Sequence, residues 1–161
     1  MKGIKYQYLK LTFTILFLPI TFFSAFSQIN NLTGSDSLLQ RAQELLEQRK
    51  YERCRDMSLK ALDIDPNCGQ AYILIAYAYI LTADSCFDKN LEKRMVYFLA
   101  LDKFEKAKEV DTLLTEKVNK LINIYSNYLP DLEECYCFFY EGDTVKIGCW
   151  INENTVIRNA H

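Results

Sequence analysis

Residues 71–81, AYILIAYAYIL, constrain the fold most, because eleven consecutive residues carry no charge. As a β-strand this stretch would be apolar on both faces and would need cover on both sides. As a helix it carries two apolar stripes, one of Tyr72, Ile75, Ala76 and Tyr79 and one of Ile73, Tyr77, Ile80 and Leu81. Periodicity alone does not choose between them. Helical patterns surround the stretch and no strand pattern lies nearby, so we predict a helix packed between neighbours.

The flanking segments also have helical patterns. Apolar residues recur at helical spacing over residues 38–46, and a second helix is expected from about residue 51 to Ile64. Pro66 ends that helix, because proline disfavours helix in the residue before it. Residues 118–125 repeat the same apolar phase. The sequence therefore predicts antiparallel helix pairs over residues 38–129, preceded by a polar linker at residues 28–37.

Small and aromatic residues follow a regular order in these helices. Tyr72, Ile75, Ala76 and Tyr79 are followed in the next helix by Ala100, Phe104 and Ala107, and are preceded by Leu38, Ala42, Leu45, Cys54, Ala61 and Pro66. This order resembles that of tetratricopeptide repeats, helix-turn-helix units of about 34 residues. Alanine at such contacts lets helix backbones approach closely. The resemblance implies a mainly α fold, a right-handed stack of antiparallel helix hairpins.

The chain departs from the repeat pattern at three places. Arg41 and Ser58 stand where the family has other residue types, and Thr112 stands where a proline would close the second unit. In addition, Ala107 follows Ala61 by 46 residues, which is about 12 more than the repeat length. We place the excess in a connector over residues 82–93.

The composition changes after Pro130. Three β-rich runs, residues 136–140, 144–151 and 155–158, are separated by turn signals. We predict a short antiparallel β meander within the tail, residues 130–161, with one face formed by Val145, Ile147, Cys149 and Ile151. The meander would cap the open end of the helical stack, because a terminal repeat must hide its apolar side. An irregular tail held by disulfides is the alternative.

The N-terminus has the pattern of an export signal. Three lysines precede an uncharged run over residues 11–26, and small residues stand at Ala25 and Ser27 near its end, as a cleavage site requires. We predict a signal peptide at residues 1–27 and a periplasmic or secreted mature chain. An uncleaved membrane anchor is the alternative, although Pro19 interrupts a run that is slightly short for a span. The layout resembles that of small exported repeat proteins of Bacteroidetes.

Six cysteines lie beyond the predicted signal peptide, and export would place them where disulfides persist. Antiparallel packing brings the start of the second helix towards the end of the third, which predicts a Cys54–Cys86 bridge. In the tail, hairpin pairing would place Cys149 opposite Cys137 or Cys135. A small, buried and unpaired Cys54 is the alternative to its bridge.

Patterns for catalysis and metal binding are sparse. The only histidine is the final residue, His161, so the sequence offers no convincing Ser-His or Cys-His pair. No glycine-rich phosphate loop occurs, and a single Cys-x-Cys motif at Cys135 and Cys137 is weak as a zinc site. Cleavage would leave 16 basic and 21 acidic residues, a net charge of −5, which disfavours nucleic-acid binding. We therefore predict no enzyme activity, no metal and no cofactor.

The resemblance also implies a place for ligand binding. In tetratricopeptide repeats the first helices line a concave face where extended peptides dock. Carried over by position, that face consists of Gln43, Glu47, Gln70, Ile73, Tyr77, Asn119, Asn123 and Asn127. For the apolar Ile73, packing in the core is the alternative. We expect an exported, non-catalytic scaffold for a protein or peptide, without a membrane span after cleavage; a structural subunit or assembly adaptor of a cell-envelope complex and an envelope hydrolase are the alternatives.

Overall fold

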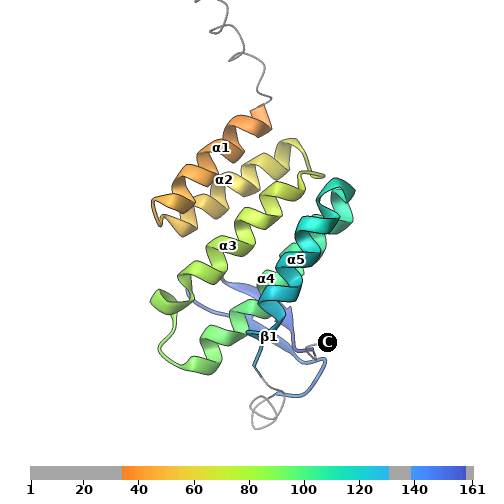
Figure 1. Cartoon of the computed structure of the whole chain (residues 1–161). Coiled ribbons are helices and arrows are strands. Elements are labelled where there is room, and N and C mark those ends of the chain that lie inside the picture. The colour runs from red at the N-terminus through yellow and green to blue at the C-terminus, as the bar shows by residue number, and fades with distance from the viewer. Residues whose placement is uncertain (1–33, 131–138, 159–161) are drawn as a thin grey trace, which may run out of the picture. The chain divides into compact units, whose positions relative to one another are not determined.

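A computed structural model describes residues 34–130 and 139–158 of the chain (Figure 1). The described part is mainly helical and ends in a small antiparallel sheet, as the sequence predicted at that level. Its elements are α1 (Gly34–Glu47), α2 (Tyr51–Ile64), α3 (Gly69–Cys86), α4 (Asn90–Val110), the 3-10 helix η1 (Thr112–Leu114), α5 (Thr115–Ser126), β1 (Thr144–Ile147) and β2 (Glu153–Val156). The predicted signal peptide, Cys135, Cys137 and most of the first predicted tail strand lie outside the described residues.

The apolar stretch forms the centre of α3, so the predicted helix is confirmed. Ile75, Ala76 and Tyr79 of the first stripe are buried, whereas in the second stripe Ile73 is fully buried, Tyr77 and Ile80 are partly buried and Leu81 is 50% exposed. The cover comes from α2 and α4, which pack on α3 from the two sides, and from α1. Short connections make successive helices antiparallel (Figure 1). A helix that is apolar all round is stable here because other helices surround it.

Small residues form the contacts between helices. The fully buried alanines are Ala42, Ala61, Ala71, Ala76, Ala78, Ala100 and Ala107. At the start of α3, a Cβ added to Gly69 would lie 2.9 Å from the carbonyl oxygen of Ala107 and 2.7 Å from Cβ of Asp111. Only glycine therefore allows the start of α3 to approach the end of α4 this closely.

Two helix boundaries differ from those expected. Helix α1 begins at Gly34, before the apolar pattern starts, because Ser35 is buried against α2 with its hydroxyl 3.5 Å from the carbonyl oxygen of Ala61. The predicted connector over residues 82–93 is wrong. Most of that segment is helical, since α3 continues to Cys86 and α4 begins at Asn90. The residues expected to form a connector therefore lengthen α3 and α4.

The tail forms a two-stranded hairpin in which Thr144 pairs with Val156 and Ile147 with Glu153. β1 is shorter than the predicted run 144–151, whereas β2 has the predicted length but begins two residues earlier than residue 155. The chain turns after Ile147, with φ values of 59° at Cys149 and 51° at Asn152. Cys149 and Ile151 consequently do not continue the strand face of Val145, which corrects the predicted four-residue face. The buried side chains of the hairpin and its turn are instead Ile147, Ile151, Thr155 and Ile157.

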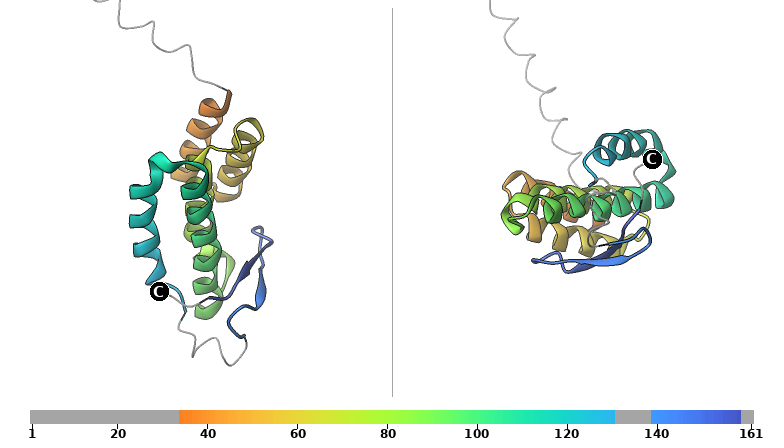
Figure 2. Two further views of the ribbon diagram at one scale, coloured as in Figure 1. Left: turned by 90° about the vertical axis from the view of Figure 1, so that its right-hand side faces the viewer. Right: turned by 90° about the horizontal axis from the view of Figure 1, so that it is seen from below.

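The hairpin packs on α4. Figure 2 shows it on the side of the helices opposite α5. The predicted cap on the open end of the stack is therefore wrong for the described part of the tail, because that end is formed by α5. The hairpin occupies the space beside the lengthened α3–α4 pair, where the shorter α1–α2 pair provides no cover.

Candidate functional site

A disulfide attaches the tail to the helices. Cys86, the last residue of α3, is bonded to Cys149 in the hairpin turn. The predicted Cys54–Cys86 bridge is therefore wrong, as is the pairing of Cys149 with Cys137. Cys54 is a buried free thiol whose sulfur lies 3.9 Å from the carbonyl oxygen of Leu74. Because α3 rises about 1.5 Å per residue, Cys86 lies roughly 18 Å further along the helix and out of reach of Cys54.

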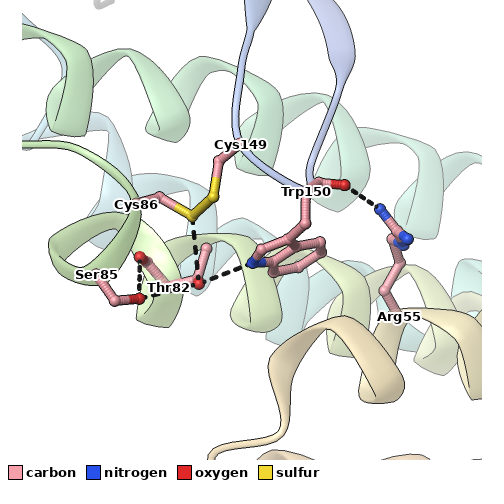
Figure 3. The surroundings of a disulfide bond; sticks show 6 residues. All are labelled: Arg55, Thr82, Ser85, Cys86, Cys149 and Trp150. Atoms are coloured by element: carbon pink, nitrogen blue, oxygen red, sulfur yellow. Dashed lines mark hydrogen bonds between the residues drawn. A yellow bond between two sulfur atoms is a disulfide. The ribbon is translucent and has the colours of Figure 1, made fainter.

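Trp150 connects the tail to both helix pairs (Figure 3). Its indole N–H donates to the Thr82 hydroxyl at 3.1 Å. Arg55 of α2 donates to the Trp150 carbonyl at 2.7 Å, and its guanidinium lies 4.9 Å from the centre of the indole ring. The indole is thus held by hydrogen bonding and by a cation–π contact beside the disulfide.

Two carboxylates continue this attachment along the hairpin. Glu153 accepts hydrogen bonds from the Tyr79 hydroxyl and from Lys103, the latter at 2.6 Å. Asp102 of α4 accepts from Thr155 at 2.7 Å and from Arg158 at 2.6 Å. Burial, together with Glu153, raises the pKa of Tyr79 well above its usual value. Every charge in this network has a partner, so we assign it a structural role.

The residues predicted for the concave face differ in their burial and in their contacts. Gln43 and Glu47 are exposed on α1, where the Gln43 amide donates to the Glu47 carboxylate at 3.0 Å. Ile73 is fully buried, so the alternative of core packing holds for it. Gln70 accepts from Lys117 at 3.0 Å, which links the start of α3 to α5.

The three predicted asparagines are exposed, Asn119 and Asn123 on α5 and Asn127 directly after it. Asn119 accepts a hydrogen bond from Lys108 of α4 at 3.3 Å. The Asn127 amide donates to the carbonyl oxygens of Asn123 and Ile124, at 2.7 Å and 3.3 Å, and so caps the C-terminus of α5. The Asn127 side-chain oxygen has no hydrogen-bond partner within residues 34–130 and 139–158 and can accept one from a ligand.

Tyr77 belongs to a row of aromatic rings from α3, α4 and the end of α5. We call this row the aromatic ladder; its members are Tyr77, Phe104, Tyr125, Tyr97 and Tyr128. Tyr77 meets Phe104 edge-on at 5.9 Å between ring centres, and Phe104 stacks on Tyr125 at 5.6 Å. Tyr97 stacks on Tyr125 at 6.1 Å and on Tyr128 at 5.3 Å. The ladder runs from the buried Phe104 to Tyr128, which is 52% exposed.

A shallow hollow of about 410 Å³ adjoins the exposed end of the ladder. Its lining includes Tyr97, Tyr128, Asn127 and Arg94. The Arg94 guanidinium donates to the Leu129 carbonyl at 2.6 Å, which holds the chain after α5 against α4. Burial raises the pKa of Tyr97, so its hydroxyl stays protonated at neutral pH and can donate a hydrogen bond. The hollow therefore combines flat aromatic surface with polar groups at its edge.

The sequence interpretation located two members of this region and missed two. Helical phase gave Tyr77 and Asn127, which lie at the ladder and at its hollow. Tyr97 was missed because it belongs to α4, where the resemblance implied no ligand-binding residues, and Tyr128 because it follows the end of α5. The i, i+3 spacing of Tyr125 and Tyr128 was the available signal.

Neither metal-ligand clusters of the described residues nor comparisons with known proteins identify a further functional site. Within the described residues, no three His, Cys, Asp or Glu side chains cluster in a way that could hold a metal ion. None of the helices in residues 34–130 is both long and apolar enough to cross a membrane. Comparisons with protein-family models, with curated proteins and with solved structures found no match to this chain.

Proposed function

We propose that this protein is an exported, non-catalytic helical-repeat scaffold of the tetratricopeptide type, which binds an extended peptide segment of a partner protein beside α3 and α5. The aromatic ladder is the central feature of the proposed site. The hollow next to Tyr97 and Tyr128 would hold a side chain of the peptide.

Packing supports the repeat assignment. Ala76, Ala100 and Ala107 occupy the small-residue positions of the tetratricopeptide pattern, and all are fully buried. Tyr79 and Phe104 occupy its large-residue positions and are also fully buried. Successive helices contact one another in chain order, as the hairpins of such a stack do.

The Cys86–Cys149 disulfide supports export. Disulfides persist in oxidising compartments and are rare where thiols are kept reduced. The bond closes a 63-residue interval, so it constrains the unfolded chain strongly. Such a bond suits a small domain that functions outside the cytoplasm.

The exposed end of the ladder is the observation that carries the binding proposal. Tyr128 leaves half of its surface to solvent beside a hollow. The hydroxyls of Tyr97 and Tyr128 and the side-chain oxygen of Asn127 have no hydrogen-bond partner elsewhere in the described residues. Tyrosine gives a large rigid contact area with one polar group at low entropic cost, which is why it dominates many peptide-binding surfaces.

A peptide selection tests the proposal. The oxidised protein is used to select binders from a random displayed-peptide library, and single labelled peptides are then titrated by fluorescence anisotropy. Tyr128→Ala is expected to weaken binding about tenfold or more, as loss of an interface tyrosine does. Tyr140→Ala is the matched control, because Tyr140 is a 71% exposed tyrosine in the tail. Equal losses in the two variants, or none in Tyr128→Ala, would refute the site.

An assembly adaptor is the second candidate, favoured by exposed apolar side chains near the open end of the helices. Leu113 is 93% exposed and Ile124 is 50% exposed, and contact with a second copy or a partner subunit would remove these apolar side chains from water. Light scattering after size-exclusion chromatography separates the two functions. A stable oligomer at low micromolar concentration that Ile124→Lys dissociates would support assembly, whereas a monomer would leave peptide binding as the function.

A further inference from the structure

A second hollow lies where the start of α2 meets the end of α3. Its volume is about 690 Å³, and we call it the α2–α3 groove. It is lined by residues 49–53, by the last two turns of α3 and by Trp150. The binding face proposed above does not include this groove, although Asp84 borders both hollows.

Cations with no acidic partner dominate one wall of the groove. Arg49 and Arg53 form no ion pair with any carboxylate of the described residues. Lys50 donates to the neutral side-chain oxygen of Gln48 at 2.8 Å, which leaves its charge uncompensated. Three positive charges therefore face the groove in a chain whose formal net charge is −2.

The carboxylates of the groove do not cancel these charges. Asp84 pairs with Lys93 at 3.0 Å, a lysine that lies outside the groove lining. Glu52 remains as the single unpaired acid against the three cations. The groove thus keeps a positive excess, which attracts an acidic ligand.

The groove lining also includes apolar surface. Leu81 is 50% exposed there, and Trp150 is fixed by its bond to Thr82 and by the neighbouring disulfide (Figure 3). A surface whose aromatic side chain is already immobile loses little entropy on binding. A ligand with both carboxylates and an apolar side chain would match the two walls.

The backbone conformation at Arg49 allows a substitution that separates an effect on binding from an effect on folding. Arg49 has a φ of 58°, and the bonds from Arg49 N–H to Leu46 and from Lys50 N–H to Leu45 form the C-terminal cap of α1. Glycine is the residue that adopts this conformation without strain. Replacing Arg49 by glycine therefore removes a groove cation while relieving the fold, so weaker binding by the variant cannot come from unfolding.

We propose that the α2–α3 groove binds an acidic peptide segment that carries an apolar side chain. The carboxylates of the peptide pair with Arg49, Lys50 and Arg53, and its apolar side chain packs on Leu81 and Trp150. A peptide fits better than a nucleic acid or a membrane surface, because the groove is small and includes apolar surface between two helix ends.

The test uses the full chain with its disulfide intact and a labelled decapeptide of glutamates around two central leucines. Its counterpart has glutamine at every glutamate position. Anisotropy titrations should show binding of the acidic peptide that weakens with salt, and much weaker binding of the glutamine peptide. Arg49→Gly should reduce the affinity about threefold, and Arg49→Gly with Arg53→Gln about tenfold. The melting temperature of Arg49→Gly should equal or exceed that of the wild type.

Arg41→Gln is the matched control, because Arg41 is an exposed arginine of α1 outside the groove. It should leave the affinity unchanged, and so should Tyr128→Ala of the aromatic ladder. Equal affinity for the two peptides, full affinity in Arg49→Gly, or the same loss in Arg41→Gln would overturn the proposal. Binding to vesicles of anionic phospholipid without binding to the acidic peptide would overturn it as well.

Discussion

The α1–α2 pair and the α3–α4 pair are both antiparallel helix pairs, but they differ in helix length and in the elements that pack on them. The first pair has two helices of 14 residues, whereas α3 and α4 have 18 and 21. The first pair packs through a small cluster around Ala42, Leu45 and Cys54. The second pair supplies most of a larger core, which also includes Ile147, Ile151 and Ile157 of the tail.

The difference in helix length creates the surface to which the tail attaches. The longer helices α3 and α4 extend past the first pair; the last turns of α3 carry Thr82 and Cys86, and the middle of α4 carries Asp102, to which the tail is bonded. The tail covers this extension on the side opposite α5 (Figure 2). The aromatic ladder lies on the α5 side, so structural attachment and the proposed binding use opposite sides of the same helix pair.

The largest expected loss of stability comes from removing a buried ring from the core of the α3–α4 pair. Phe104→Ala should destabilise the protein by about 3–5 kcal/mol, because a fully buried ring in contact with Tyr77 and Tyr125 is lost. Urea unfolding followed by circular dichroism measures the change. Leu59→Ala, at a 44% exposed position of α2, is the control. A Phe104→Ala cost below that of Leu59→Ala would contradict the assigned core.

Removal of the Cys86–Cys149 disulfide should have the second largest effect on stability. Cys86→Ser with Cys149→Ser is expected to cost about 2–4 kcal/mol, because the bond closes a 63-residue interval. Trp150 is the only tryptophan of the chain, so its fluorescence reports on the tail. The emission should shift to the red in the variant, and Cys68→Ser should change nothing. Identical unfolding midpoints with and without reductant would exclude a structural role for the bond.

A smaller effect is expected where the start of α3 meets the end of α4. Gly69→Ala should cost about 1–3 kcal/mol, since the new methyl group would overlap Ala107 and Asp111 at the end of α4. Gly148→Ala provides a comparison, because a Cβ there meets only Phe87 at 4.0 Å. Thermal unfolding of both variants decides the point. Equal stability of the two would show that the helix approach at Gly69 is not tight.

The smallest effect concerns Cys54 in the first pair. Burial raises the pKa of its thiol from 9.0 to about 11. The folded chain thus holds this proton more tightly than the unfolded chain, so the contribution of Cys54 to stability is full below pH 9 and is lost as the pH rises towards 11. Unfolding measured from pH 8 to higher pH should show a steeper decline for the wild type than for Cys54→Ala. Parallel curves for the two proteins would contradict a raised pKa of the Cys54 thiol.

Much of the helical body could be predicted from the sequence, because its signals are local. Apolar periodicity and a proline stop gave the central helix, and the alanine positions gave its contacts. The lengthening of α3 and α4 was missed because residues 82–93 are largely polar. Thr82 is buried in that segment, but its partner Trp150 lies far away in the chain, and local periodicity does not contain that contact.

The sequence predicted the cysteine pairing and the proposed binding face incompletely, for different reasons. Antiparallel packing correctly brought α2 beside α3, but Cys54 lies next to Leu74 rather than next to the end of the helix. The position of Cys149 depends on a left-handed turn residue that strand alternation does not reveal. On the binding face, helical phase found Tyr77 and Asn127 but placed the fully buried Ile73 there too, because phase does not measure cover.

A nuclear magnetic resonance titration tests most directly whether recognition belongs to the longer pair and its neighbour α5. The ¹⁵N-labelled protein is titrated with a library-selected peptide, and backbone amide shifts are mapped on the chain. The account predicts shifts concentrated around Tyr97 and residues 124–128. Shifts concentrated on α1 near Gln43 and Glu47, with the ladder unchanged, would contradict it.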